Sequence, residues 1–122
     1  MKVNFYDTVD DKLLKFSVII SKHDGKWVLC KHKERNTYEI PGGHREPNET
    51  IYETAMRELS EETGALQFDI APICVYSVTG KTRVNQTGEE TYGMLFFADI
   101  QTFESVLHSE MENVFFFDTL PT

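Results

Sequence analysis

Apolar runs of a few residues, rich in β-branched and aromatic side chains, recur along the chain and are typical of β-strands. An Asp24-Gly25 pair between two of the runs predicts a tight hairpin, because both residues tolerate the backbone that such turns need. Residues 80–88 are polar and predict a loop, whereas residues 101–113 show no clear period and predict an irregular link. The predicted strands are residues 3–9, 13–21, 27–32, 38–40, 67–79 with a bend at Pro72, 91–100 and 114–117.

One segment, between the strands at 38–40 and 67–79, has a helical period instead. Thr50 with Glu53 three residues later predicts a capping box at the start of the helix, and Asn48 is the alternative N-cap. Gly64 predicts the end, since helices often close on a residue in the left-handed conformation. Apolar residues spaced four apart predict the buried face: Ile51, Ala55 and Leu59.

A single helix among strands predicts one α/β domain, residues 1–122, with the helix packed on a mixed sheet. The strands at 13–21 and 91–100 are apolar on both faces, which is typical of a sheet buried on both sides. One helix covers only one face, and a bare apolar face is unusual on a soluble monomer. We therefore expect a homodimer to cover the second face. The alternatives are that residues 101–113 fold across it or that the chain is shortened relative to its natural product.

The composition says more about the possible binding partners than about the fold. A formal net charge of −8 argues against a nucleic-acid polymer as the main partner, because phosphate backbones require a basic surface. The chain has no signal-peptide core or membrane-length apolar run, and Cys30 and Cys74 lie apart in strand-like stretches without metal-ligand spacing. These features predict a cytoplasmic protein with reduced thiols, bound neither to a membrane nor to zinc.

The acidic side chains of the predicted helix are arranged against the rules of local helix stability. Glu58, Glu61 and Glu62 fall within one narrow sector, and like charges three or four residues apart repel one another. Two of them lie in the last turn, where the helix dipole favours cations. A solvated acidic face is the simple alternative, but a hard divalent cation would turn the repulsion into binding. Arg57 is placed to reach Glu53 and Glu61, four residues away on either side.

The spacing of these residues extends upstream into the loop before the helix. Gly43 is followed after five residues by Glu49, and after seven more by Arg57-Glu58-Leu59-x-Glu61-Glu62-x-Gly64. This pattern resembles the Nudix box, the signature of the Nudix hydrolases. Ala65 departs from the larger aliphatic residue that the family usually carries, and we expect this to alter packing rather than chemistry. With residues 38–42 included, the resemblance covers about a quarter of the chain closely.

The resemblance implies an α/β/α sandwich around a mixed sheet, with the box helix on one face and usually a second helix after the last strand. No helical pattern follows residue 117, so we expect that C-terminal helix to be absent. The resemblance also implies Mg²⁺, or Mn²⁺, held by Glu58, Glu61, Glu62 and Glu49. Arg57 would orient a carboxylate and completes the implied catalytic set with the three helix glutamates. The general base is open between Glu58 and a glutamate of a later loop: Glu89, Glu90 or Glu110.

The function implied by the resemblance is hydrolysis of a nucleoside triphosphate to the monophosphate and pyrophosphate, as in MutT-like enzymes that act on oxidised nucleotides such as 8-oxo-dGTP. The alternatives are another nucleoside diphosphate derivative, such as ADP-ribose or a dinucleoside polyphosphate, or a module that senses nucleotides without hydrolysis. Loss of a box carboxylate would favour the sensing module, and none is lost.

The candidate substrate-binding residues lie on both sides of the short strand at 38–40. Lys31 and Arg35 belong to the basic cluster at 31–35, which is either a phosphate-facing patch or a solvated loop. Gly43 predicts an unusual backbone conformation or close approach to a ligand or metal. His44 and Arg45 lie in the predicted loop over the site and are further candidates for substrate contact.

Overall fold

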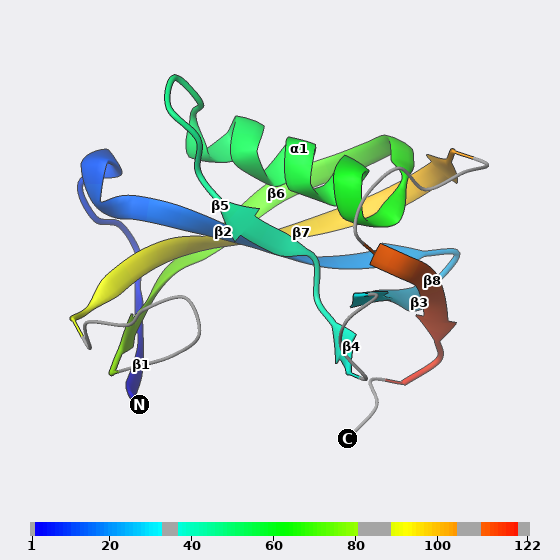
Figure 1. The fold of residues 1–122 in the computed structure, drawn as a ribbon, viewed down its shortest axis with the longest axis horizontal. Coiled ribbons are helices and arrows are strands. Elements are labelled where there is room, and N and C mark those ends of the chain that lie inside the picture. The colour runs from blue at the N-terminus through cyan, green and yellow to red at the C-terminus, as the bar shows by residue number, and fades with distance from the viewer. Residues whose placement is uncertain (1, 33–36, 81–88, 105–110, 120–122) are drawn as a thin grey trace.

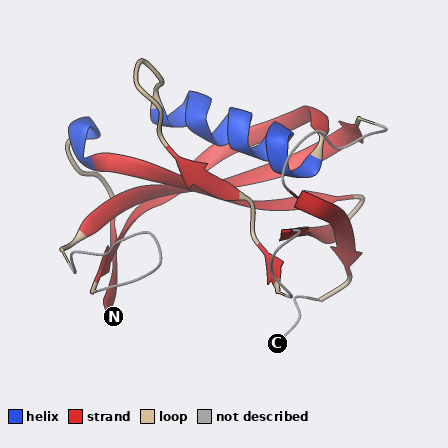
Figure 2. Ribbon diagram, viewed as in Figure 1, coloured by secondary structure: helices blue, strands red, loops and turns tan. Residues whose placement is uncertain are grey.

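The computed structural model describes residues 2–32, 37–80, 89–104 and 111–119 (Figure 1). Besides a short 3₁₀ turn, η1 (Asp11–Leu13), the described residues contain one α-helix, α1 (Ile51–Thr63). Figure 2 shows this helix lying across one face of a layer of strands. The strands are β1 (Lys2–Tyr6), β2 (Leu14–His23), β3 (Lys26–His32), β4 (Tyr38–Glu39), β5 (Gly42–His44), β6 (Ala65–Thr79), β7 (Thr91–Phe103) and β8 (Met111–Phe117).

The strands of the described residues form a single eight-stranded sheet, which runs in the order β1-β6-β7-β2-β3-β4. Two strands lie off this path, because β5 pairs with β2 and β8 pairs with β3. The β2–β7 pair is parallel and the other pairs are antiparallel, which confirms the predicted mixed sheet. The predicted tight turn joins β2 to β3, with Asp24 and Gly25 at φ of 50° and 77°.

The strand predictions differ from the structure mainly where pairing partners decide the outcome. Residues 101–103 extend β7 and residues 111–113 begin β8, so the expectation of an irregular link is wrong there. The expected loop at Gly43 and His44 is also wrong, because β5 pairs with β2 and places Gly43 opposite Ser17. The bend at Pro72 is confirmed by a register shift between Pro72 and Cys74. Residues 81–88, which make up nearly all of the predicted polar loop, lie outside the described residues.

Helix α1 begins and ends where the local signals predict. The Thr50 hydroxyl accepts a hydrogen bond from the Glu53 N–H at 3.0 Å, and the Glu53 carboxylate accepts one from the Thr50 N–H at 2.9 Å. Asn48 lies in the preceding loop with φ of 68°, so Thr50 is the N-cap. Gly64 ends the helix in the left-handed conformation, with φ of 77°. These contacts satisfy backbone groups that would otherwise lack partners at the two ends.

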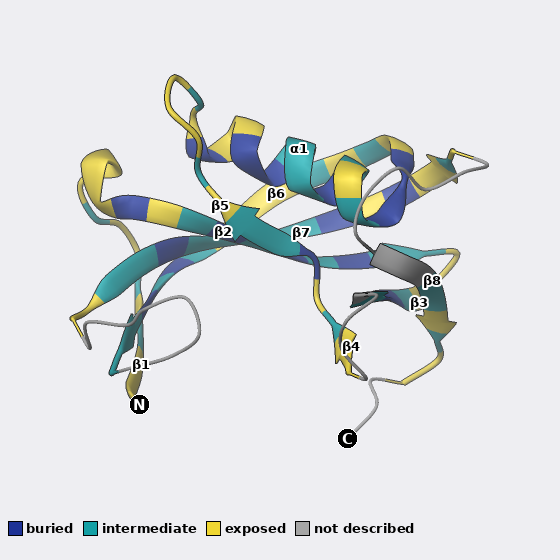
Figure 3. Ribbon diagram, viewed as in Figure 1, coloured by how far each residue is buried: buried dark blue, intermediate teal, exposed yellow. Residues whose placement is uncertain are grey.

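The buried core lies between α1 and the sheet (Figure 3). The predicted stripe is buried, because Ile51, Ala55 and Leu59 are 7%, 0% and 0% exposed. The Tyr52 ring also packs edge-on against Phe96 of β7. Sheet residues of the same core cluster include Ile19, Val28, Val75, Phe96, Ala98 and Ile100. This packing fixes the helix on the sheet and thereby fixes the direction in which its opposite side faces.

The second face of the sheet carries the side chains that alternate with this core. Val18 of β2 and its partner Leu95 of β7 lie at such positions and are half-buried. In the described ranges no α-helix lies on this face, and residues 101–103 and 111–113 belong to the sheet instead of crossing it. The prediction that residues 101–113 fold across the face is therefore wrong for these residues. The homodimer stays a prediction.

Both cysteines have free thiols, as predicted. Cys30 is buried in β3, and burial raises the pKa of its thiol above the usual range. Cys74 is half-buried in β6. Among the described residues no helix has both the length and the apolar character needed to cross a membrane.

Candidate active site

Two consecutive glycines bring the backbone of β5 against the carboxylates of α1. The Gly42 N–H donates a hydrogen bond to Glu62 Oε2 at 2.7 Å. A Cβ atom at Gly43 would lie 2.6 Å from both carboxylate oxygens of Glu58, so any side chain here would displace that carboxylate. Gly43 is not among the described residues with positive φ. Glycine is therefore required at position 43 because the Glu58 carboxylate occupies the space that a side chain would need. The prediction of an unusual backbone conformation is wrong.

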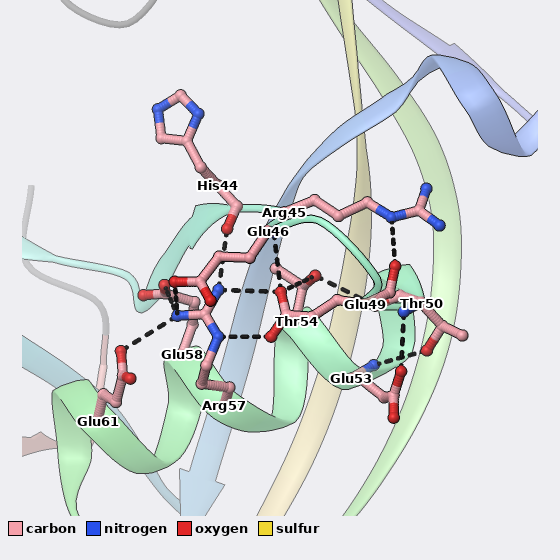
Figure 4. Close-up of polar contacts among 10 residues, drawn as sticks. All are labelled: His44, Arg45, Glu46, Glu49, Thr50, Glu53, Thr54, Arg57, Glu58 and Glu61. Carbon is pink, nitrogen blue, oxygen red and sulfur yellow. Dashed lines mark hydrogen bonds and ion pairs between the residues drawn. The ribbon is translucent and has the colours of Figure 1, made fainter.

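Arg57 lies at the centre of the polar contacts in this region (Figure 4). Its Nη1 donates to Glu58 Oε1 at 2.6 Å and to Glu61 Oε2 at 3.2 Å. Its Nε donates to Glu49 Oε2 at 2.6 Å, and its Nη2 reaches the His44 carbonyl oxygen at 3.0 Å. The predicted contact with Glu61 is confirmed. The predicted contact with Glu53 is wrong, because the Glu53 carboxylate is used in the capping box.

Glu49 is held by donors from three directions. Besides Arg57, its carboxylate accepts hydrogen bonds from the Glu46 N–H and the Thr54 hydroxyl, both at 2.9 Å. The hydrogen bond from Arg57 is the main reason that the pKa of Glu49 is lowered to about 2. These contacts stabilise the carboxylate charge. Glu49 thus fixes Arg57 from the loop side while Arg57 reaches the helix glutamates.

Two carboxylates of the helix, those of Glu58 and Glu62, have raised pKa values instead. The pKa of Glu62 is raised to about 8, mainly by burial and also by the neighbouring charges of Glu58, Glu39 and Glu61, against the lowering effect of the Gly42 N–H. Burial also raises the pKa of Glu58, and the charge of Glu61 adds to this against the lowering effect of Arg57. The predicted mutual repulsion is therefore present in the structure. A nearby positive charge would relieve it.

The carboxylate oxygens of the helix glutamates suit a hard divalent cation. In the present side-chain conformations, however, they do not point to one common position. Within the described residues, one oxygen of each helix carboxylate is used by Arg57 or Gly42 and the other is not: Glu58 Oε2, Glu61 Oε1 and Glu62 Oε1. No group of three acidic, histidine or cysteine side chains in the described ranges is arranged to hold a metal ion. Glu61 is 53% exposed, so its side chain has room to turn toward the other two.

The sequence of nearly the whole chain matches a known family. A model of the NUDIX domain matches residues 11–119, which include β5, the loop and α1. The chain belongs to the Nudix family. Gly43, Glu49, Arg57, Glu58, Glu61, Glu62 and Gly64 are therefore its Nudix box, and α1 is the box helix.

Two curated relatives come from Bacillus subtilis strain 168. The chain is 40% identical over 86 residues to a protein named "Putative 8-oxo-dGTP diphosphatase YtkD", which covers 70% of this chain and 50% of the relative. It is 37% identical over 59 residues to a second protein named "Putative 8-oxo-dGTP diphosphatase", covering 48% of this chain and 40% of the relative. The chain thus spans half or less of the length of these relatives.

Solved structures of Nudix proteins share the fold. The crystal structure of a mutant of the Bacillus subtilis pyrophosphohydrolase BsRppH matches with a TM-score of 0.81 and 31% identity, covering 98% of this chain and 73% of that one. An Ap4A hydrolase from C. elegans matches with a TM-score of 0.65 and 17% identity, covering 85% and 80% of the two chains. At this lower identity the likeness concerns the fold alone. The mixed sheet with α1 on one face is thus a Nudix fold.

The structure describes only some of the other predicted site residues. Lys31 pairs with Tyr38 across β3 and β4, whereas Arg35 and Glu110 are not described. The His44 ring packs against Phe16, with ring centroids 4.6 Å apart. Arg45, a further candidate for substrate contact, binds the N-terminal 3₁₀ turn across 34 positions of sequence. No local sequence signal indicates a contact of that separation.

Of the later glutamates, Glu90 has the clearest surroundings. It precedes β7, and its carboxylate accepts hydrogen bonds from Tyr6 at 2.9 Å, Ser77 at 2.6 Å and Tyr92 at 2.8 Å. These hydroxyls lower the pKa of Glu90. A carboxylate stabilised in its charged form is a poor proton acceptor. Glu89 is exposed beside it. The pKa of Glu58, in contrast to that of Glu90, is raised, chiefly by burial.

Proposed function

We propose that this chain is a Mg²⁺-dependent pyrophosphohydrolase that splits a nucleoside triphosphate into the monophosphate and pyrophosphate. The observation that carries the proposal is the carboxylate cluster of the box helix. Glu58 and Glu62 have raised pKa values because they are buried and repel their neighbours, and each keeps an oxygen free of hydrogen bonds among the described residues. A purely structural cluster would have its charges compensated, as those of Glu49 and Glu90 are.

The residues that would hold Mg²⁺, or Mn²⁺ in its place, are Glu58, Glu61 and Glu62, with Glu49 at the edge of the site. Their carboxylate oxygens are the hard donors that these cations prefer. When bound, the cation supplies neutralisation of the phosphate oxygens and activation of water. Arg57 keeps its contacts with Glu49 and thereby limits the directions in which Glu58 and Glu61 can turn.

The proposed role of Glu58 is that of general base. Hydrolysis forms a bond between the water oxygen and phosphorus, breaks one P–O–P bond, and releases pyrophosphate with the bridging oxygen. The proton lost by water passes to the Glu58 carboxylate, which Arg57 holds through Oε1. Gly43 leaves the room in which this carboxylate lies. A base held in this way is already positioned before the substrate arrives.

The names of the two Bacillus subtilis relatives support an oxidised purine nucleotide, 8-oxo-dGTP, as the substrate. The net charge of −8 favours a single nucleotide over a polymer. All box carboxylates are present, which disfavours a module that binds nucleotides without hydrolysis.

A substrate panel tests the proposal. The purified protein with millimolar Mg²⁺ would be incubated with 8-oxo-dGTP, dGTP, ADP-ribose, a dinucleoside tetraphosphate and an oligonucleotide carrying a 5′-triphosphate, and the products identified by chromatography. We expect 8-oxo-dGTP to give the monophosphate and pyrophosphate at the highest kcat/KM, and EDTA to stop the reaction. Preference for ADP-ribose, the dinucleoside or the oligonucleotide would reject the substrate but keep the chemistry. Binding of nucleotides without any product would reject the chemistry.

A further inference from the structure

Arg45 joins two segments that are far apart in the sequence. On one side, its Nη2 donates to Asp11 Oδ2 at 3.0 Å and its Nη1 donates to the Asp11 carbonyl oxygen at 3.0 Å. Nη1 also lies 3.3 Å from the Leu14 carbonyl oxygen. On the other side, its Nε donates to the Glu49 carbonyl oxygen at 2.7 Å. The guanidinium thus connects η1 to the loop of residues 45–49, which we call the box loop.

The contact with Glu49 places two arginines on one residue. Arg45 holds the backbone carbonyl of Glu49, while Arg57 holds its carboxylate (Figure 4). Arg57 in turn contacts Glu58 and Glu61. A continuous series of contacts therefore runs from Asp11 through Arg45, Glu49 and Arg57 to the helix carboxylates.

Apart from the Arg45 side chain, the contacts of the box loop are internal or run to α1, except that the Arg45 N–H donates to the Lys15 carbonyl oxygen of β2 at 2.8 Å. Asn48 has φ of 68°, a left-handed conformation that costs free energy for residues other than glycine. The Glu49 N–H makes a 3.2 Å hydrogen bond to the Glu46 carbonyl oxygen within the same loop. The Arg45 side chain is only 20% exposed and reaches out of the loop to Asp11, which is 68% exposed and lies in η1, the turn that leads directly into β2. It therefore ties the loop to the sheet independently of the loop's internal turn.

We propose that Arg45, fixed by Asp11, is a positioning residue for the Nudix box. It sets the position of Glu49 and, through Arg57, the arrangement in which Glu58 and Glu61 receive the divalent cation. Arg45 itself does not contact the substrate. The role needs an arginine, because its donors reach acceptors on two segments at once and an ammonium group cannot match this fork. The inference rests on the proposed function for its catalytic consequence but not for its effect on cation binding.

The test compares Arg45→Lys with the wild type and with Lys12→Ala as a matched control. Lys12 lies in the same 3₁₀ turn, is 87% exposed and approaches Asp10 rather than Arg45. Mn²⁺ affinity would be measured by electron paramagnetic resonance of the free ion, and kcat and KM would be measured for the best nucleotide. Loss of a group that orients metal ligands typically costs about 10–100-fold in affinity. We expect Arg45→Lys to weaken Mn²⁺ binding by at least about 10-fold, to lower kcat, and to leave KM near the wild-type value.

A second variant, Asp11→Asn, should shift Mn²⁺ affinity in the same direction by less, because Arg45 keeps its contacts with backbone carbonyls. Unchanged Mn²⁺ affinity in a folded Arg45→Lys protein would overturn the proposal, even if its melting temperature fell, because the link would then be structural only. A raised KM with normal Mn²⁺ affinity would overturn it in favour of a substrate contact. If the wild type binds Mn²⁺ but hydrolyses no nucleotide, the proposed function fails, while the Mn²⁺ titration still decides the role of Arg45.

Discussion

Glu62 and Glu90 have the same side chain, but their surroundings shift the pKa of the carboxylate in opposite directions. Glu90 accepts three hydrogen bonds from the hydroxyls of Tyr6, Ser77 and Tyr92, and these lower its pKa. Glu62 accepts one hydrogen bond, from the Gly42 N–H, and burial with neighbouring acidic charges raises its pKa to about 8. The charge of Glu90 is compensated by the fold, whereas that of Glu62 is not.

This difference separates a structural carboxylate from one that we propose to be functional. The hydroxyls on Glu90 come from β1, β6 and β7, so the residue holds the edge strand to the hairpin beside it. Glu62 gains no comparable contact and lies near Glu58 and Glu61, which make its charge less favourable still. A fold keeps such a site when something outside the chain supplies the missing charge. Comparison of the two regions therefore supports the proposal that the box helix binds the cation.

The largest expected difference in kcat is between two variants, in which Glu62 or Glu90 is replaced by glutamine. Glu62→Gln should lower kcat by more than about 100-fold, because even residues that only orient metal ligands cost about 10–100-fold. It should also remove most of the rise in melting temperature that Mg²⁺ gives the wild type, which corresponds to about 2.7 kcal/mol at 100 times the dissociation constant. Glu90→Gln is the matched variant and should keep kcat near the wild-type value. Equal losses of activity in both variants would show that the two regions do not differ in function.

Smaller effects on kcat and stability are expected at two glycines, Gly43 and Gly93, whose backbone lies close to another side chain. A Cβ at Gly43 would meet the Glu58 carboxylate, and one at Gly93 would lie 2.6 Å from the Tyr76 hydroxyl and ring. Gly43→Ala should reduce kcat with little change in stability, because the end of a flexible side chain moves aside. Gly93→Ala should instead lower the free energy of unfolding by about 1–3 kcal/mol, as overpacking does, and keep kcat. Urea unfolding and initial rates would be measured for both; a stability loss confined to Gly43→Ala would contradict this assignment.

The smallest effect is the acid sensitivity that Glu90 contributes. Because its pKa in the folded protein lies below the ordinary value of 4.5, its contribution to stability is present above pH 4.5 and is lost as the pH falls below it. Glu90→Gln should therefore flatten the decline in unfolding free energy at and below pH 4.5. Asp7→Asn, which changes an exposed acidic residue near β1, is the control. Identical pH profiles for wild type and Glu90→Gln would mean that the hydroxyls do not stabilise the charge.

The sequence allowed the box helix to be predicted almost completely, because its signals are local. The capping pair Thr50 and Glu53, the buried stripe ending at Leu59, and the left-handed Gly64 each act within a few residues. The free energies of the two caps depend little on the rest of the fold, whereas the apolar stripe is recognised by its period although its burial requires the sheet. The crowding of acidic residues on one side of the helix is fixed by the same geometry. For this reason the candidate metal ligands could also be named from the sequence.

Long-range pairing was the part that could not be predicted. Arg57 turns to Glu49 rather than Glu53, because Thr50 already uses Glu53 and the box loop brings Glu49 within reach. Gly43 is required by the approach of Glu58, which depends on how β5 pairs with β2.

The sequence by itself determined the helix, its caps and the identity of the acidic cluster, since these depend on periodicity and on neighbours along the chain. Only the tertiary structure decided which carboxylates are compensated. Glu90 receives hydroxyls from residues up to 84 positions away, and Arg45 reaches Asp11 across 34. Whether an acidic residue is stabilised or left repelling its neighbours depends on donors that the fold brings from distant segments. That balance makes Glu90 part of the scaffold and Glu62 part of the candidate active site.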